Sequence, residues 1–183
     1  MPQERIAQFL KPQEVIAKCQ IKEGMHVADL GCGNLGYFII PIARLLGKSG
    51  QAYAVDILKT ALEGVRSKAK LEGITNLTTV WANLEKIGST AIPKESLDLA
   101  LLINVLFQNK DHQSILKEAS RLVKKQGRLI IVDWKKVGVP FGPELSQRID
   151  ANEIQQIASK LKLQVVEEIE FGQYFWGLIL QKP

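Results

Sequence analysis

The sequence predicts an α/β fold: a doubly wound, seven-stranded mixed sheet that is mostly parallel and ends in an antiparallel β-hairpin. Apolar runs of strand length alternate with helical periodicity over residues 25–134, and this βα repeat is typical of a parallel sheet with helices on both faces. The last two apolar runs, 163–171 and 174–181, are joined only by Gly172-Gln173. So short a link forces an antiparallel hairpin, because a parallel crossover needs about a dozen residues or more.

The N-terminal half is predicted to hold a helical segment followed by strands and helices in alternation. Ile6, Phe9, Val15 and Cys19 recur at helical spacing before the first strand, which indicates a broken helical segment. Pro41 is tolerated only near the start of its helix. The expected elements are a helical segment over 1–22, strand 25–30, a helix over about 36–46 that ends at Gly47, strand 51–56, a helix over about 58–72 that ends at Gly73, and strand 77–82.

The C-terminal half begins with an apolar run over 97–103, which is typical of a central parallel strand buried on both faces. A helix over about 112–125 and a strand over 128–134 follow. Asp150 can cap the next helix, with Glu153 three residues later as its capping-box partner. The closing hairpin completes the sheet.

Composition indicates an ordinary globular protein. The chain has 183 residues, of which 46% are hydrophobic and 23% charged, so we expect one domain with an N-terminal segment over 1–22 and a core over 23–183. No apolar run approaches the ~18 residues of a membrane span, and no signal peptide is evident, so a cytoplasmic location is expected. The two cysteines and two histidines predict neither a disulfide framework nor a metal site, and His26 and His112 are expected at the surface.

Positive charge is concentrated in one segment. Between Lys110 and Lys136 there are eight basic and three acidic residues, and eight minus three equals the net charge of +5 of the whole chain. One interpretation is a surface that faces RNA. The other, which we favour, is the solvated side of an amphipathic helix and its exit turn.

The most informative motif is the stretch Asp29–Gly36, between the first strand and the first helix after it. Gly31, Gly33 and Gly36 follow the spacing G-x-G-x-x-G, which lets the backbone turn tightly and lets a ligand approach main-chain N–H groups near a helix N-terminus. Asp56, twenty residues after Gly36, ends the next strand, where a carboxylate can accept hydrogen bonds from two ribose hydroxyls. The combination predicts a cofactor that contains a nucleoside.

Five stretches together resemble the class I S-adenosylmethionine-dependent methyltransferases, over nearly the whole chain. They are the loop Asp29–Gly36, Asp56 after the second strand, Trp81–Leu84 after the third, Ser96–Leu102 as the fourth, and Leu122–Trp134 leading into the fifth. A closing hairpin that inserts one antiparallel strand is the topological hallmark of that family. The resemblance implies a Rossmann-like fold, S-adenosylmethionine as cofactor and methyl transfer, and it points to the group of ubiquinone/menaquinone-biosynthesis methyltransferases.

The resemblance also implies roles for residues around the cofactor. Asp29 would help to hold its amino acid end, and Asp56 its ribose hydroxyls. Asn83 stands where the family usually has an aspartate that contacts the adenine amino group, and Leu84 would supply an adjacent backbone N–H. The cofactor-binding residues implied in this way are Asp29, Gly31, Cys32, Gly33, Asn34, Gly36, Asp56, Ile57, Asn83, Leu84, Ile103 and Asn104.

The acceptor side is less well defined. Relatives often carry a pair of histidines after the fourth strand, whereas this chain has Phe107-Gln108, so no acid–base residue is predicted there. The candidates for acceptor contact are Phe107, Asp133 at the carboxyl edge of the sheet, and Phe141. Phe141 lies in the segment 137–149, the only one long enough to act as a lid.

Methyl transfer from a sulfonium is an in-line displacement, to which the protein contributes mainly by alignment and by excluding water. A general base helps only where the acceptor arrives protonated. We expect a small-molecule acceptor, although the basic segment leaves RNA or protein open. Two other functions also stay open. One is an NAD(P)-dependent oxidoreductase, which shares the glycine spacing but usually needs a Tyr-x-x-x-Lys pair that this chain lacks; the other is a catalytically silent binding module on the same fold.

Overall fold

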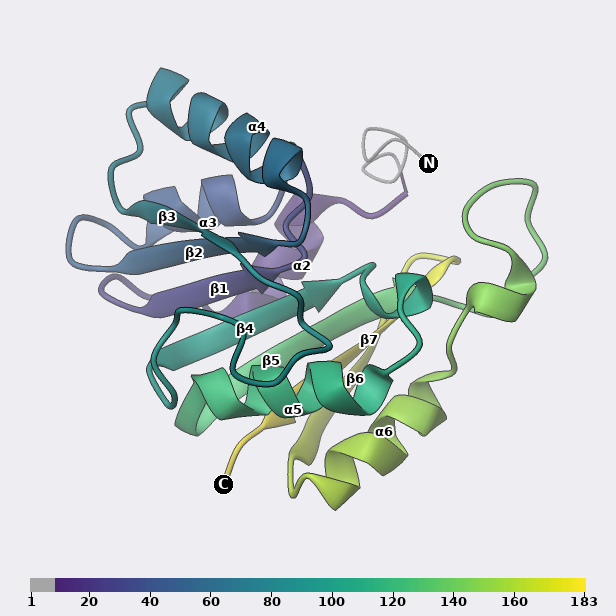
Figure 1. The fold of residues 1–183 in the computed structure, drawn as a ribbon. Helices are drawn as coiled ribbons and strands as arrows, with labels where there is room; N and C mark the ends of the chain where they lie inside the picture. Colours follow the sequence, from purple (N-terminus) through teal and green to yellow (C-terminus); the bar gives the residue numbers. More distant parts are fainter. Residues whose placement is uncertain (1–8) are drawn as a thin grey trace.

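In the computed structural model, which describes residues 9–183, all strands join one seven-stranded sheet with the order β3-β2-β1-β4-β5-β7-β6 (Figure 1). Strands β1 to β5 are parallel to one another, and β7 is antiparallel to both β5 and β6. This confirms the predicted fold class, including the hairpin that places β7 inside the sheet. The strands are β1 His26–Leu30, β2 Gln51–Asp56, β3 Leu77–Trp81, β4 Leu97–Ile103, β5 Val123–Trp134, β6 Gln164–Phe171 and β7 Phe175–Gln181.

Helices cover both faces of the sheet, with α2, α3 and α4 on one side and α5 and α6 on the other (Figure 1). No helix within residues 9–183 is both long and apolar enough to cross a membrane. Ile6, which the helical spacing included, lies outside the described residues. The helices are α2 Pro12–Cys19, α3 Ile39–Leu45, α4 Lys59–Leu71, α5 His112–Leu122 and α6 Ala151–Lys160, with short 3-10 turns η1 Leu106–Gln108 and η2 Leu145–Gln147.

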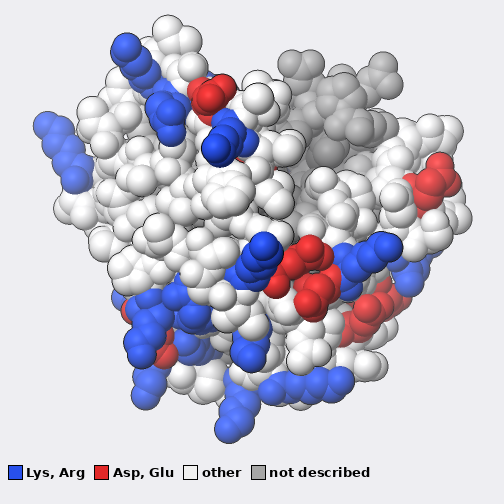
Figure 2. Space-filling model, in the orientation of Figure 1, with Lys and Arg blue, Asp and Glu red and all other residues white. Residues whose placement is uncertain are grey.

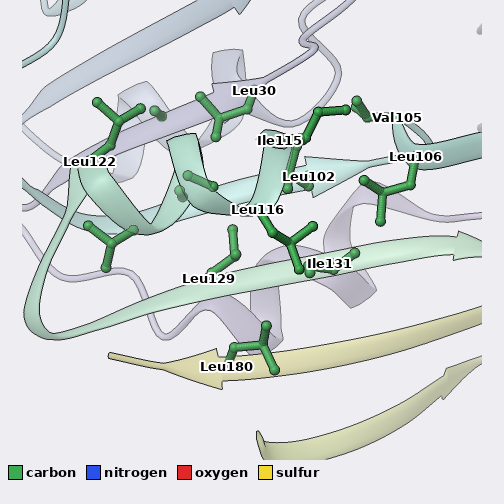
Figure 3. Close-up of a cluster of buried hydrophobic side chains, with 14 of the residues drawn as sticks. Leu30, Leu102, Val105, Leu106, Ile115, Leu116, Leu122, Leu129, Ile131 and Leu180 are labelled. Carbon is green, nitrogen blue, oxygen red and sulfur yellow. The ribbon is translucent and has the colours of Figure 1, made fainter. Parts of the chain in front are cut away.

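The central strand β4 divides two hydrophobic clusters, because its alternate side chains point to opposite faces. Leu99 and Leu101 pack with α2, α3 and α4, whereas Ala100 and Leu102 pack with α5 and α6. Figure 3 shows the second cluster, in which Leu102 lies beside side chains from α5 and β5. Full burial of such a side chain stabilises the fold by about 1.5–3 kcal/mol, so β4 anchors both layers.

The boundary between α5 and β5 differs from the prediction. The helix expected over 112–125 ends at Leu122, and β5 begins directly after it at Val123. Lys182 explains this end: its Nζ lies 2.9 Å from the carbonyl oxygen of Val123, and its own carbonyl accepts the N–H of Gln126 at 2.8 Å. A residue near the far end of the sequence therefore ends the helix, which local helical spacing cannot reveal.

The starts of α6 and α5 agree only in part with the predictions. Asp150 caps α6 as expected, since its carboxylate accepts the N–H of Asn152 at 2.9 Å. Glu153 is not its capping-box partner, because the Glu153 carboxylate lies 3.5 Å from Nδ1 of His112. The expectation of a surface His112 is wrong as well: its side chain is only 18% exposed, and its Nε2 lies 2.9 Å from the carbonyl oxygen of Asn109.

Candidate functional site

A cavity of about 910 Å³ lies at the carboxyl ends of β1, β2, β4 and β5. The chain leaves β1 toward α3 on one face and leaves β4 toward α5 on the other, so the cavity sits where open α/β sheets bind ligands. Gly36 is the one predicted cofactor residue that does not line it. The predicted residues that do are Asp29, Gly31, Cys32, Gly33, Asn34, Asp56, Ile57, Asn83, Leu84, Ile103 and Asn104.

The glycine loop is held by β2, and Gly31 and Gly36 have no room for a side chain. The N–H groups of Gly31 and Cys32 both donate to the carbonyl of Val55, at 2.8 and 3.0 Å. Gly31 has φ +91°, and a Cβ there would stand 2.5 Å from a methyl carbon of Val105. Gly36, with φ +55°, packs against α3 and α4 rather than the cavity. The motif therefore shapes the loop through conformation and close packing.

A fourth glycine, Gly64, supports the loop from α4 and was not singled out by the sequence analysis. A Cβ on Gly64 would stand 2.5 Å from the carbonyl oxygen of Asn34. Glycine inside a helix is less favourable than alanine by about 1 kcal/mol. Its presence in the middle of an amphipathic helix was the available signal for this close approach.

Asp56 ties the loop to the end of β2. Its Oδ2 accepts the N–H of Gly33 and its Oδ1 accepts the N–H of Leu58, both at 2.9 Å. Each carboxylate oxygen can accept more than one hydrogen bond, so acceptor capacity remains for ligand hydroxyls. The backbone bonds fix the orientation of the carboxylate before any ligand binds.

Asp29 is a buried carboxyl at the wall of the same cavity. Asp29 is only 1% exposed, and its Oδ2 has no hydrogen-bond partner in the described part of the chain. Burial and, secondarily, the nearby Asp56 carboxylate raise the pKa of Asp29 to about 7. A cationic group placed at this oxygen would satisfy it and favour its ionised form. Asp29 therefore fits the ammonium group of an amino acid.

The predicted adenine residues lie on a loop after β3. The side-chain oxygen of Asn83 accepts the N–H of Glu85 at 3.0 Å, and the Asn83 carbonyl accepts the hydroxyl of Ser89 at 2.6 Å. Asn83 and Leu84 line the cavity beside Ile57. The loop is thus ordered by its own hydrogen bonds, with the Asn83 amide nitrogen left to donate.

The cavity has two halves: a cofactor half formed by the glycine loop, Asp56 and the loop after β3, and an acceptor half around Phe107. Several residues of the cavity could not be identified from the sequence. Asn104 marks the transition: it has φ +56°, is 8% exposed, and its side-chain oxygen is buried without a partner among residues 9–183. Phe107 lines the cavity as predicted. The cavity residues that were not singled out as ligand contacts include Leu10, Pro12, Tyr37, Phe38, Gln108, Asn109, Trp134, Gly142, Pro143, Glu144 and Gln147.

Asp133, predicted to contact the acceptor, does not line the cavity. Its carboxylate is 1% exposed and accepts the N–H groups of Leu106, Phe107 and Trp134, at 3.0, 3.3 and 2.8 Å. Burial raises the pKa of Asp133 to about 7, against the effect of these hydrogen bonds. The structure therefore places Asp133 behind Phe107, where it fixes the backbone of the wall.

Phe141 also lies away from the cavity, in an aromatic cluster. Its ring stacks on Phe9 with centroids 4.3 Å apart and meets the edge of Tyr174 at 5.0 Å. Its neighbours Gly142 and Pro143 reach the cavity instead. The segment predicted as a lid is therefore seated on the N-terminal segment and on the closing hairpin.

Arg148 fastens residues 135–148, which overlap the predicted lid 137–149 and which we call the 135–148 loop. Arg148 as a residue is only 3% exposed. Its guanidinium donates to the backbone carbonyls of Lys135, Val137, Phe141 and Pro143, at 2.6–3.1 Å. It also lies 5.3 Å from the centre of the Trp134 ring. The sequence around Arg148 does not predict this role, because its hydrogen-bond partners are backbone carbonyls and its aromatic partner is Trp134, fourteen residues earlier.

The basic side chains of residues 110–136 are divided between the two sides of the sheet. Figure 2 shows lysine and arginine side chains over the lower part of one face, where α5 lies, with acidic side chains among them. Arg121 and Lys135 form ion pairs with acidic residues. Arg128 points to the other side of the sheet and donates to the carbonyl of Cys19 on α2.

Several known proteins with a similar sequence or structure are methyltransferases. A family model described as a methyltransferase domain matches residues 21–176. The chain is 29% identical over 172 residues to the ubiquinone/menaquinone biosynthesis C-methyltransferase UbiE of Pseudoalteromonas translucida, covering 93% of this chain and 65% of that protein. It is 24% identical over 121 residues to a demethylmenaquinone methyltransferase of Geobacillus sp., covering 66% of this chain and 50% of the relative.

The fold is shared with a crystal structure of a SAM dependent methyltransferase from Aquifex aeolicus. The TM-score is 0.86 at 24% identity, with 97% of this chain and 92% of the other covered. The similarity in sequence is therefore low while the architecture is common to both over nearly their full lengths. In contrast, the chain spans about half to two thirds of the length of the two curated relatives.

Proposed function

We propose that this chain, which belongs to the methyltransferase-domain family, is an S-adenosylmethionine-dependent methyltransferase that methylates a small-molecule acceptor by in-line displacement. The observation that carries the proposal is the pair of buried carboxylates at one edge of the sheet. Among residues 9–183 the Asp29 carboxylate has an oxygen without a partner, and Asp56 is oriented by two backbone N–H groups. These two groups suit the ammonium and the ribose of S-adenosylmethionine.

The residues of the cavity divide between the two ends of this cofactor. We propose that Asp29 holds the amino acid end, that Asp56 accepts the ribose hydroxyls, and that Asn83 and Leu84 contact the adenine. Ile103 and Asn104 would line the side of the cavity that holds the methyl group, because Ile103 ends β4 and Asn104 follows it between the two halves of the cavity. When bound, the cofactor supplies a methyl group on a sulfonium, a leaving group that is already activated.

The acceptor half supports a small molecule with apolar parts. Phe107, Trp134 and Pro143 provide apolar walls, and Gln108 and Gln147 provide neutral hydrogen-bonding groups. The related UbiE is named for ubiquinone/menaquinone biosynthesis, which agrees with a small organic acceptor. The 135–148 loop would exclude water from this half, and Asp133 would keep Phe107 in place, so that the nucleophile stays aligned.

We also propose that residues 1–183 act as one domain in a reducing compartment such as the cytoplasm. Cys19 and Cys32 are both buried and unpaired, and free thiols are typical of proteins kept under reducing conditions.

Calorimetry and a labelling assay test the function. The protein should bind S-adenosylhomocysteine and not NADH, and it should transfer labelled methyl groups from S-adenosylmethionine to a component of a metabolite extract. An RNA pool and a protein extract, treated separately, test the other acceptor classes. Binding without transfer to any pool would instead favour a catalytically silent binding module.

A further inference from the structure

The loop after β3 is held in place from outside the cavity by Glu118. This residue lies on α5, is fully buried, and does not line the cavity. Its Oε2 accepts the N–H of Gly88 at 2.7 Å, and its Oε1 accepts both the N–H of Thr90, at 3.4 Å, and the hydroxyl of Thr90. One carboxylate thus binds the backbone of this loop at two points.

Arg121, one turn further along α5, neutralises that carboxylate. Its Nε and Nη2 donate to the two oxygens of Glu118 at 2.8 Å each, and Nη2 also donates to the Thr90 hydroxyl at 2.8 Å. Burial by itself would raise the pKa of Glu118, but the hydrogen bonds from Arg121, Gly88 and Thr90 outweigh it and lower the pKa to about 2. The carboxylate therefore stays charged, and a charged acceptor makes stronger hydrogen bonds than a neutral one.

The anchored residues connect directly to the cavity. Ser89, which lies between the two anchored residues, donates its hydroxyl to the carbonyl of Asn83 at 2.6 Å. The N–H of Lys86 donates to the same carbonyl at 3.0 Å. Asn83 and Leu84 are cavity residues, so the position of Gly88–Thr90 fixes the backbone that presents them.

We propose that Glu118 and Arg121 are positioning residues for the cofactor. By anchoring Gly88 and Thr90 to α5, they hold Asn83 against the nucleoside end of the cavity, and cofactor affinity depends on an ion pair that touches no ligand. The inference rests on the proposed function, because Asn83 contacts the adenine only where S-adenosylmethionine binds as described above. It adds a support that lies outside the cavity and outside the glycine motif.

A double-mutant cycle measured by calorimetry tests this proposal. The dissociation constant of S-adenosylhomocysteine is measured for the unmodified protein, Glu118→Gln, Asn83→Ala and the double variant. We expect Glu118→Gln to weaken binding about tenfold, within the range measured for residues in one hydrogen-bond network. The losses should be clearly less than additive, because Glu118→Gln acts in part through the Asn83 contact that Asn83→Ala removes.

Additive losses in the cycle, or an unchanged dissociation constant for Glu118→Gln, would overturn the proposal. Failure of the unmodified protein to bind S-adenosylhomocysteine would count against the proposed function instead. Glu72→Gln is the matched control: it breaks the ion pair with Arg44, which lies outside the cavity, and should leave binding unchanged.

A milder variant covers the case in which Glu118→Gln does not fold. Thr90→Val removes only the hydroxyl that links Glu118 and Arg121 to the loop. It should keep a cooperative thermal transition and weaken S-adenosylhomocysteine binding about threefold, at the lower end of such network effects. A folded Thr90→Val protein with unchanged affinity would contradict the positioning role.

Discussion

The two halves of the cavity are built in different ways. The cofactor half consists of short segments that directly follow strands, and these segments bond to each other: Gly33 to Asp56, and Gly31 to Val55. The acceptor half is assembled from segments far apart in the chain, including Leu10, Trp134 and the 135–148 loop. The contrast teaches that this fold carries cofactor chemistry in local motifs, whereas the acceptor chamber depends on long-range packing.

The largest effect expected in the cofactor half comes from Gly31→Ala. The added Cβ would overlap a methyl group of Val105 at a backbone conformation that alanine rarely adopts. We expect S-adenosylhomocysteine affinity to fall by about a hundredfold, since strain and overpacking together cost about 3 kcal/mol. Calorimetry measures this loss. Gly73→Ala is the control: it is also at positive φ, but no atom of residues 9–183 lies within 4 Å of the added Cβ. Equal affinity of both variants would show that the loop is not tightly packed.

Asp29→Asn should produce the next largest effect and a change in pH dependence. Because the pKa of Asp29 is raised to about 7, affinity for S-adenosylhomocysteine should increase as the pH rises from 6 to 8 and the carboxyl ionises. At pH 8 the variant should bind about thirtyfold more weakly, since it lacks a charged hydrogen bond of about 2 kcal/mol. The variant should also lose the pH dependence. An equally steep pH profile in the variant would remove Asp29 from the site.

The same variant has an opposite effect on the stability of the ligand-free protein. A carboxyl whose folded pKa lies above its unfolded value of 3.8 binds more protons in the folded state between these two values, so its contribution to stability falls as the pH rises from about 4 to 7. Asp29→Asn should therefore raise the melting temperature at pH 8. A lower melting temperature there would indicate an unrecognised cation beside Asp29.

Asp56→Ala should weaken S-adenosylhomocysteine binding about tenfold or more, for the loss of hydrogen bonds of about 1.5–3 kcal/mol to a charged group. Part of this loss is indirect, because the N–H groups of Gly33 and Leu58 lose their partner. Asp56→Asn keeps an acceptor for one of them and should lose less. Full affinity in Asp56→Ala would refute the ribose assignment.

The smallest effect on cofactor binding is expected from Arg148→Met, which tests the acceptor half. Four backbone carbonyls of the 135–148 loop lose their donor, so the KM for the acceptor found by labelling should rise about fivefold or more as the loop loosens. The affinity for S-adenosylhomocysteine should stay within about twofold, because Arg148 does not line the cofactor half. A comparable loss at both ends would show that the two halves are not independent.

Much of the fold could be read from periodicity and turn length. The bounds of β2 and β4 agree with the predicted runs 51–56 and 97–103, and the short link between the last two runs, which is three residues long in the structure, forced the antiparallel hairpin. The end of α5 could not be read, because Lys182 fixes it from the far end of the sequence. Local pattern therefore located the elements, while contacts between distant residues decided where one of them stops.

The sequence by itself determined the glycine loop, the two carboxylates Asp29 and Asp56, and the edge of the sheet at which they meet, because these depend on residue type and on strand direction. Only the tertiary structure decided that Asp133 supports the cavity wall from behind and that Arg148 and Glu118 hold loops in place. The physical reason is that their partners are backbone N–H and carbonyl groups. Every residue except proline carries both, so no pattern of side chains reveals which of them a distant charge will bind.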